Sequence, residues 1–196
     1  MEVLGIACSP RVRSNSTALL ERFLEGAQSQ GVRTRMVSLR TLNFEWCNGC
    51  ESCSVTGRCV FDDDLTVLFR RLDVADGVAV AAPVYAMGMN ALGKAMIERA
   101  QEYWARAYLL NQPPRAGKRR AFFISTAGTS LPGVFDCSLK TVRYFFRILG
   151  FRWGGEMLVS AVDAAGEIER RPDWLDQAGR SGARFARSLQ HSEGWE

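Results

Sequence analysis

The chain has 196 residues, 47% of them hydrophobic, which suits one globular α/β domain and excludes a disordered chain. The net charge of +4 is small, and no stripe of basic residues interleaves with aromatic ones, so we expect no nucleic-acid partner. The sequence shows neither an apolar stretch of membrane-spanning length nor a secretory signal at its N-terminus, so a cytoplasmic protein without membrane contact is expected.

Strands and helices are predicted to alternate along the chain. Short apolar runs predict five strands, namely Val3–Ala7, Val32–Leu39, Gly77–Ala82, Arg120–Ser125 and Met157–Val162. Apolar residues at helical spacing predict five helices, namely Thr17–Gln30, Leu65–Val74, Asn90–Leu110, Ser138–Leu149 and Trp174–Leu189. Such alternation builds right-handed βαβ units, so we predict a parallel sheet with helices on both faces. One domain would cover residues 1–190, with a tail at 191–196.

Four cysteines fall within one short segment, in the order Cys47-x2-Cys50-x2-Cys53-x5-Cys59. Three thiolates separated by two residues can surround one side of an inorganic cluster, and a fourth from the same segment can complete its ligation. The spacing favours one [4Fe–4S] cluster, because the chain has no second cysteine run. Zinc and free or redox-active thiols are the alternatives, although structural zinc sites usually use two cysteine pairs joined by a long linker.

Other reactive or charged residues have structural interpretations. Cys8 and Cys137 have apolar neighbours and are expected to be buried. The basic run 118–120 directly precedes an apolar strand and is expected to be solvated. The acidic run 62–64 is predicted to cap the helix that follows it. The one histidine, His191, lies in the tail, so no catalytic Ser/His or Cys/His arrangement is predicted.

Three of the predicted strands are followed by loops suited to a ligand, and in such sheets ligands bind beyond the carboxyl ends of the strands. The loop 9–17 places hydroxyls, an amide and two arginines at a helix N-terminus, which favours an anion. It lacks the glycine patterns of dinucleotide and P-loop sites, so a monophosphate is the expected ligand, with simple helix capping as a compatible alternative. The segments 83–90 and 125–130 could hold a flat ring; otherwise they are core residues and a turn.

These features together resemble the iron–sulfur flavoproteins of the flavodoxin-like NAD(P)H-dependent FMN reductase superfamily. The matching pieces are Ser9-Pro10-Arg11-x3-Asn15-Ser16, the cysteine run, and the segments 62–64, 83–85 and 162–168. The resemblance implies an α/β fold that is a flavodoxin-like three-layer sandwich with a five-stranded parallel sheet of order 2-1-3-4-5. It also implies a homodimer or homotetramer, with the cluster near the flavin of the same or a neighbouring subunit. Cys8 departs from the family, which commonly has glycine there.

The resemblance also implies the residues that bind the cofactors. The FMN phosphate would be bound by the loop after the first strand, through Ser9, Arg11, Ser14, Asn15, Ser16 and Thr17. The flavin ring would lie against Pro83, Val84, Tyr85 and Met87, with Ser125, Ala127 and Gly128 on its other side. The cluster would be ligated by Cys47, Cys50, Cys53 and Cys59.

The expected function is therefore electron transfer by a flavoprotein that holds FMN and a [4Fe–4S] cluster. Its donor would be a ferredoxin-like protein or NAD(P)H, and its acceptor O2, peroxide, a quinone or another protein. One alternative is an NAD(P)H-dependent FMN or quinone reductase without an iron–sulfur cluster. The other is a zinc-stabilised binding module with no redox role.

Overall fold

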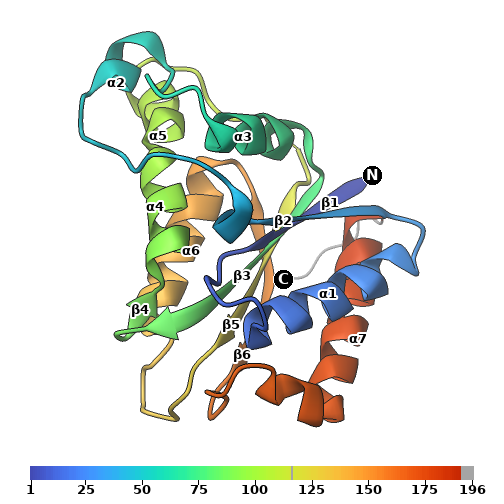
Figure 1. Ribbon diagram of the computed structural model, residues 1–196. Helices are drawn as coiled ribbons and strands as arrows, with labels where there is room; N and C mark the ends of the chain where they lie inside the picture. Colours follow the sequence, from blue (N-terminus) through green and yellow to red (C-terminus); the bar gives the residue numbers. More distant parts are fainter. Residues whose placement is uncertain (116, 191–196) are drawn as a thin grey trace.

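Five parallel strands form the central sheet of the structure, a computed structural model that describes residues 1–115 and 117–190 (Figure 1). The strands are β1 (Glu2–Ala7), β2 (Arg33–Ser38), β3 (Gly77–Tyr85), β5 (Arg120–Thr126) and β6 (Arg152–Val159). Their order, β2-β1-β3-β5-β6, is the predicted 2-1-3-4-5 order. The additional short strand β4 (Gly88–Met89) pairs antiparallel with β3. The predicted tail lies outside the described residues.

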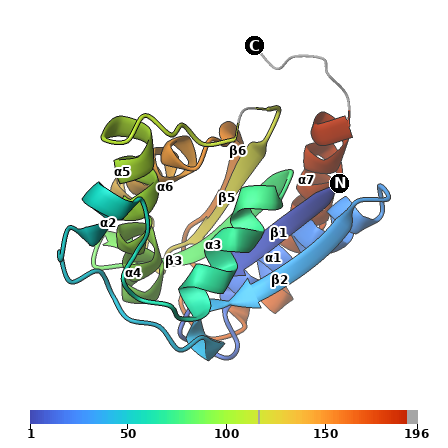
Figure 2. The same cartoon turned by 90° about the horizontal axis from the view of Figure 1, so that it is seen from above.

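Helices cover both faces of the sheet, as Figure 2 shows from above. The longer helices are α1 (Asn15–Gln28), α3 (Asp64–Val74), α4 (Ala91–Arg99), α5 (Gln101–Tyr108), α6 (Asp136–Ile148) and α7 (Pro172–Gln190), and the short ones are η1 (Leu39–Thr41), α2 (Ser52–Thr56) and η2 (Glu167–Arg170). Among these, no helix of the described residues combines the length and hydrophobicity needed to cross a bilayer.

The sheet separates two hydrophobic cores because alternate residues of a strand point to opposite faces. Val3 and Ala7 of β1 pack toward α1 and α7. Leu4 and Ile6 pack on the other face, in the core that also contains residues of α3, α4, α5 and α6. With both faces covered, the central strands are apolar throughout, which explains why continuous apolar runs mark them in the sequence.

The predicted elements have slightly different limits in the structure, and two of them differ most. The helix predicted over Asn90–Leu110 is interrupted at Ala100, which has φ −71° and ψ 7° and ends α4 before α5 begins. The last strand begins at Arg152 rather than at the predicted Met157. The prediction missed its first residues because Gly154 and Gly155, at a register shift opposite β5, interrupt the apolar pattern of the strand. The break at Ala100 matters for the site, because residues on both sides of it line the pocket of the cysteine segment.

Arg119 contradicts the expectation that the basic run 118–120 is solvated. It is only 3% exposed, and its guanidinium donates to the backbone oxygens of Ala75 at 3.1 Å, Leu149 at 2.9 Å and Leu72. It also stacks on the ring of Phe151, with its Cζ 3.8 Å from the ring centroid. The planar guanidinium can satisfy several carbonyls at once, so this arginine joins the ends of α3 and α6 to the start of β5.

The two cysteines outside the run differ in exposure. Cys8 is fully buried as predicted, and burial raises the pKa of its thiol to about 12. Cys137 is exposed, so the prediction that it is buried was wrong. It lies in the first turn of α6, whose buried face is formed by residues such as Ser138, Val142 and Phe145.

At Gly182, helices α1 and α7 pack with their backbones in close approach. A Cβ on Gly182 would lie 1.8 Å from the backbone oxygen of Phe23, whereas a Cβ on Gly179 would lie 3.7 Å from its nearest neighbour, the oxygen of Arg22. We therefore expect Gly182→Ala to lower the free energy of unfolding by about 1–3 kcal/mol or more, since backbone cannot yield as a side chain can.

The matched substitution Gly179→Ala is expected to be neutral, or to stabilise by up to about 1 kcal/mol through its better helix propensity. Urea unfolding followed by far-UV circular dichroism measures both changes. Equal stabilities for the two variants would contradict the close approach of α1 and α7 at Gly182.

Candidate functional site

The cysteine segment lies over the junction of α4 and α5, and α2 packs beside α5 (Figures 1 and 2). All four predicted ligands line one pocket of about 560 Å³, which they share with residues of that junction. Cys47, Cys53 and Cys59 are partly buried there, and Cys50 is exposed. The structure thus places the four thiols around a single cavity.

Left-handed backbone conformations turn the segment between its cysteines. Gly49 has φ 70° and Gly57 has φ 71°, a region that glycine adopts without steric cost. Glu51, with φ 59°, begins α2 in the same conformation and is a less usual residue for it. The backbone N–H of Cys50 donates to Oδ1 of Asn48 at 3.1 Å, which tightens the first turn. These turns bring cysteines separated by two residues to the same side of the segment.

The thiols affect one another electrostatically. Burial raises the pKa of the Cys53 thiol, and the negative charges of Cys47, Cys59 and Cys50 raise it further. A cation at the centre would reverse this repulsion, as metal binding does for thiols in general. The number and chemistry of the donors therefore fit a four-thiolate cluster. Within the described residues, however, no three cysteine, histidine or acidic side chains already lie in positions to share one metal ion.

An ion pair closes the base of the cysteine segment. Arg99, at the end of α4, donates to both carboxylate oxygens of Asp63, at 2.7 Å and 3.2 Å. Asp63 also caps α3 by accepting from the N–H of Leu65 at 3.0 Å, and it accepts from the N–H of Glu45 at 3.1 Å. The capping role was predicted from the acidic run, but the partnership with Arg99 was not, because nothing local in the sequence links residues so far apart.

The proton affinities of this pair follow from its contacts. Burial by itself would raise the pKa of Asp63, but hydrogen bonds from Arg99 and from the N–H of Glu45 outweigh it and hold that pKa below its usual value. For Arg99 the effect of burial has the opposite sign and would lower the pKa, but Asp63 and the nearby Cys59 side chain outweigh it and hold the pKa of Arg99 above its ordinary value. Both groups are therefore charged at neutral pH.

The loop after β1 forms the second part of the site. Ser14 caps α1 by accepting from the N–H of Thr17 at 3.3 Å, and its hydroxyl lies 3.1 Å from that of Ser16. The amide of Asn15 is used inside the protein: it donates to the oxygen of Ala164 at 3.0 Å and accepts from the N–H of Ile168 at 3.1 Å. Asn15 thus fixes η2 and the turn that precedes it against the start of α1.

The three predicted strand-end loops meet in a small pocket at the carboxyl edge of the sheet. Of the predicted residues, those that line it are Ser9, Arg11, Ser14, Asn15, Pro83, Val84, Tyr85 and Gly128. The predicted residues Ser16, Thr17, Met87, Ser125 and Ala127 lie outside this lining. Three further lining residues come from the ends of β5 and β6, namely Thr126, Val162 and Asp163. All three fall within the segments 125–130 and 162–168 that the sequence already singled out, at or beyond the carboxyl ends of these strands.

Arg11 bridges two of these loops. Its guanidinium donates to the backbone oxygen of Asp163 at 2.6 Å and lies 4.0 Å from that residue's carboxylate. The pocket they share has a volume of about 30 Å³, against about 300–1,000 Å³ for typical small-molecule sites. The pocket therefore has room only for a small group, of the size of a phosphate. A flat ring would lie outside it, where Tyr85 is 39% and Met87 44% exposed.

Helix α4 connects the two parts of the site. At its N-terminus, Asn90 donates to the backbone oxygen of Cys8 at 2.6 Å, beside the β1 loop. At its C-terminus, Arg99 reaches the cysteine pocket. The nine residues of α4 span about 14 Å along the helix axis. The strand-edge pocket and the cysteine pocket of one chain therefore lie at opposite ends of this helix.

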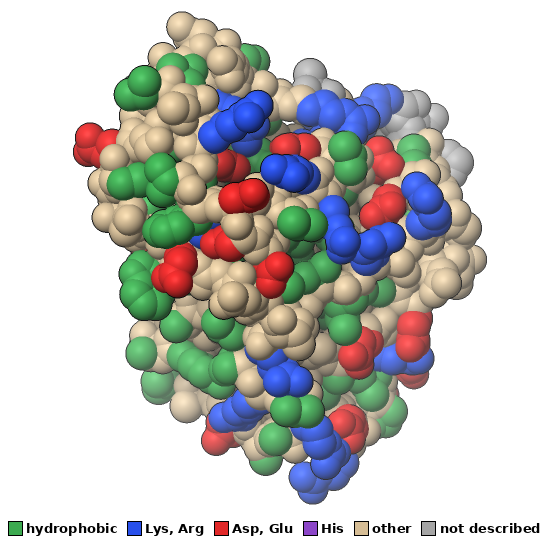
Figure 3. All heavy atoms as spheres, turned by 45° about the horizontal axis from the view of Figure 1, so that its top comes forward, with side chains coloured by type: hydrophobic (Ala, Val, Ile, Leu, Met, Phe, Trp, Pro, Cys, Tyr) green, Lys and Arg blue, Asp and Glu red, His purple; other side chains and the backbone are tan. Residues whose placement is uncertain are grey.

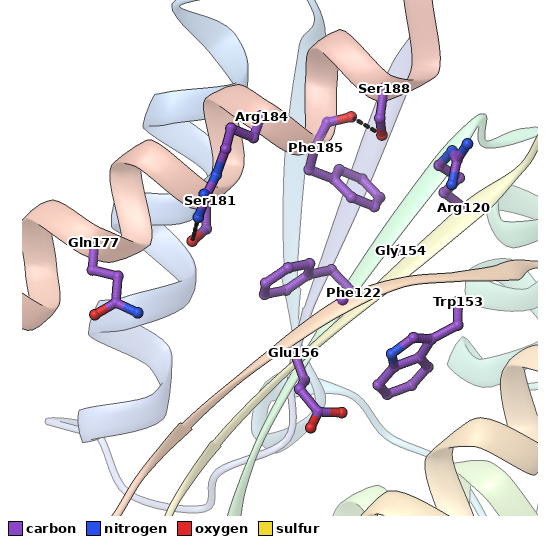
Figure 4. Close-up of a pocket in the computed structure, with 11 residues that line it drawn as sticks. Arg120, Phe122, Trp153, Gly154, Glu156, Gln177, Ser181, Arg184, Phe185 and Ser188 are labelled. Atoms are coloured by element: carbon purple, nitrogen blue, oxygen red, sulfur yellow. Dashed lines mark hydrogen bonds between the residues drawn. The ribbon is translucent and has the colours of Figure 1, made fainter. Parts of the chain in front are cut away.

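A third cavity, of about 380 Å³, lies between α7 and the N-terminal halves of β5 and β6 (Figure 4). The rings of Phe122 and Phe185 meet edge to face beside it, with centroids 6.0 Å apart. It contains none of the predicted site residues.

On the face shown in Figure 3, acidic and basic side chains are interspersed rather than gathered by sign.

Comparisons with known proteins agree with this geometry. The family model described as NADPH-dependent FMN reductase matches residues 1–150. An iron–sulfur flavoprotein from Methanosarcina thermophila is 34% identical over 150 residues, covering 76% of this chain and 75% of that protein. One from Methanocaldococcus jannaschii is 33% identical over 148 residues, covering 76% and 72%.

Two solved structures show the same fold. An NAD(P)H:quinone oxidoreductase from Methanothermobacter marburgensis has a TM-score of 0.73 at 20% identity, over 99% of both chains. A flavodoxin from the domain Archaea has a TM-score of 0.59 at 14% identity, over 97% of this chain and all of that one. The fold, the extent of the family match and the two archaeal relatives lead to one conclusion. The chain belongs to the NADPH-dependent FMN reductase family, among its iron–sulfur flavoproteins, and is a flavin-dependent oxidoreductase.

Proposed function

We propose that this oxidoreductase is an electron-transfer protein that holds FMN at the carboxyl edge of its sheet and one [4Fe–4S] cluster in its cysteine segment. The observation that carries the proposal is the single pocket lined by Cys47, Cys50, Cys53 and Cys59. The naming of the curated relatives as iron–sulfur flavoproteins supports it. Bound FMN exchanges one or two electrons and a [4Fe–4S] cluster exchanges one, so the pair would convert two-electron into one-electron transfers.

The protein groups at the strand edge would bind and orient the flavin. The hydroxyl of Ser9 and the guanidinium of Arg11, beside the N-terminus of α1, suit the phosphate as charge-assisted donors. Pro83–Tyr85 would support the ring at the end of β3. Because Asn15 already bonds to Ala164 and Ile168, its role in the proposal is to hold the phosphate loop rather than the phosphate.

The arrangement of the two pockets supports electron transfer between subunits. The pockets lie at opposite ends of α4 in one chain, so a homodimer or homotetramer could bring the cysteine pocket of one subunit near the flavin of another. The donor in this proposal is a ferredoxin-like protein or NAD(P)H, and the acceptor is O2, peroxide, a quinone or a protein.

A second function is favoured by a specific observation. Since no three candidate ligands among residues 1–115 and 117–190 already share a metal position, the chain could be an FMN or quinone reductase with free thiols. Purification without oxygen, followed by iron, zinc and flavin analysis, distinguishes the two. We expect one FMN and about four irons per chain, the content of one [4Fe–4S] cluster. FMN without iron would favour the second function, and zinc with no flavin would overturn both.

A further inference from the structure

Arg99 is a buried charge with an unusual set of partners. Arg99 is only 2% exposed, and a charge that is buried in this way is tolerated only when it is paired and hydrogen-bonded. Asp63 supplies the pair, as described above. The remaining hydrogen bonds of the guanidinium go to backbone, and their positions in the sequence indicate what this side chain does.

The two backbone contacts lie symmetrically about the cysteine run. Nη1 donates to the oxygen of Glu45 at 2.7 Å, and Nη2 donates to the oxygen of Phe61 at 3.4 Å. Glu45 is two residues before Cys47, the first cysteine, and Phe61 is two residues after Cys59, the last. One planar side chain therefore joins the start and the end of the segment, and the Phe61 ring lies beneath it at 5.1 Å.

Arg99 also brings positive charge to the wall of the cysteine pocket. Among the described residues that line the pocket, it is the one cation, whereas Glu51, Glu98 and Glu102 are acidic. Its Nε is buried and has no hydrogen-bond partner in the described part of the chain. Four thiolates would add further negative charge to this pocket, and a fixed positive charge at its wall would offset part of it.

We propose that Arg99 is the positioning residue of the cysteine segment, which it holds closed at both ends while it supplies the positive charge that the thiolates face. The first part concerns the protein alone. The second part rests on the proposed function, because it concerns a bound cluster. The fixed charge would favour the reduced cluster, which carries the more negative charge, and so raise its reduction potential.

Two substitutions separate the parts of this role. Arg99→Gln removes the charge and the ability to bridge two carbonyls. Arg99→Lys keeps the charge but replaces the planar fork by a single ammonium group. The matched control is Arg70→Gln, which removes one charge from α3, where Arg70 is exposed and approaches Asp62 at 3.9 Å.

The first measurement uses iron-free, reduced protein without oxygen and follows alkylation of each loop thiol by iodoacetamide with peptide mapping. We expect Cys47 and Cys59 to react about tenfold faster in both Arg99 variants, because the segment opens locally, and unchanged rates in Arg70→Gln. Rates in both Arg99 variants that equal those of the control would overturn the proposal. This result does not depend on iron, so it decides the first part even if the chain proves to bind no cluster.

The second measurement uses the iron-loaded protein and determines the reduction potential of the cluster. We expect a more negative potential in Arg99→Gln than in Arg99→Lys, with Arg70→Gln close to the unsubstituted chain. A potential that is the same in both Arg99 variants would overturn the role of the charge.

Hydrogen exchange on the unsubstituted chain tests the closure if the Arg99 variants fail to fold. The N–H of Glu45, which donates to Asp63, should exchange as slowly as the amides inside α3. Exchange at the rate of the exposed amides around Cys50 would show that the segment is open at its base and would overturn the proposal.

Discussion

Asp63→Ala is expected to lower the free energy of unfolding by about 3–5 kcal/mol, the largest effect on stability that we predict for a single side chain. The substitution leaves the buried guanidinium of Arg99 without its counter-charge, and the side chains of this pair are 1% and 15% exposed. It also removes the cap of α3, an interaction of about 1 kcal/mol. Urea unfolding of the iron-free, reduced protein at pH 7 measures the change.

Asp62→Ala is the matched control, because Asp62 is the neighbouring acid but its side chain is 86% exposed and lies 3.9 Å from Arg70. Exposed pairs of this kind contribute about 1 kcal/mol or less. An effect of Asp63→Ala no larger than that of Asp62→Ala would show that Arg99 is satisfied without its counter-charge.

The stabilisation by Asp63 should depend on pH in a defined direction. Its pKa is lower in the folded chain than its unfolded value of about 3.9, so its contribution is fully present above that value. The contribution is lost as the pH falls through the lower, folded pKa, where the carboxylate binds a proton. The difference in stability between the unsubstituted chain and Asp63→Ala should therefore be constant above about pH 5 and shrink below about pH 4.

Cys50→Ser is expected to remove the iron while FMN remains bound. One thiolate fewer leaves a four-ligand cluster incomplete, so iron should fall from about four per chain to near zero in oxygen-free preparations. FMN should stay near one per chain, because the strand-edge pocket lies at the other end of α4. Iron analysis and the flavin absorption of the same sample provide the measurement.

Cys137→Ser is the control for this substitution, since Cys137 is also exposed but lies on α6, outside the cysteine pocket. It should retain both cofactors. Loss of FMN together with iron in Cys50→Ser alone would show that the two sites are structurally coupled, contrary to the separation that α4 provides.

Local patterns predicted most of the architecture. Strands buried on both faces read as continuous apolar runs, and Gly154–Gly155 concealed the start of the last one. The order of the parallel strands followed from the family resemblance and was confirmed. The capping of α3 was also predictable, since the acidic residues that cap a helix lie next to its first turn in the sequence.

The candidate site was only partly predictable, because some of its contacts are local in the sequence and others are not. The cysteine run is compact in sequence, so spacing alone identifies its four thiols as one group. Asn15, by contrast, was assigned to the phosphate through the family resemblance, whereas its amide bonds to Ala164 and Ile168, far along the chain. Thr126 and Asp163 joined the pocket because the sheet brings strand ends together.

By itself, the sequence determined the fold class, the cysteine segment and the loops at the strand ends, because periodicity, spacing and helix termini are local properties of the chain. Only the tertiary structure decided that Arg99 joins the two ends of the cysteine segment and that α4 separates the two pockets. Such contacts depend on where a helix ends and on which distant backbone oxygens it then meets. A buried charge must be paired and hydrogen-bonded, but no local pattern in the sequence indicates which residues its partners are.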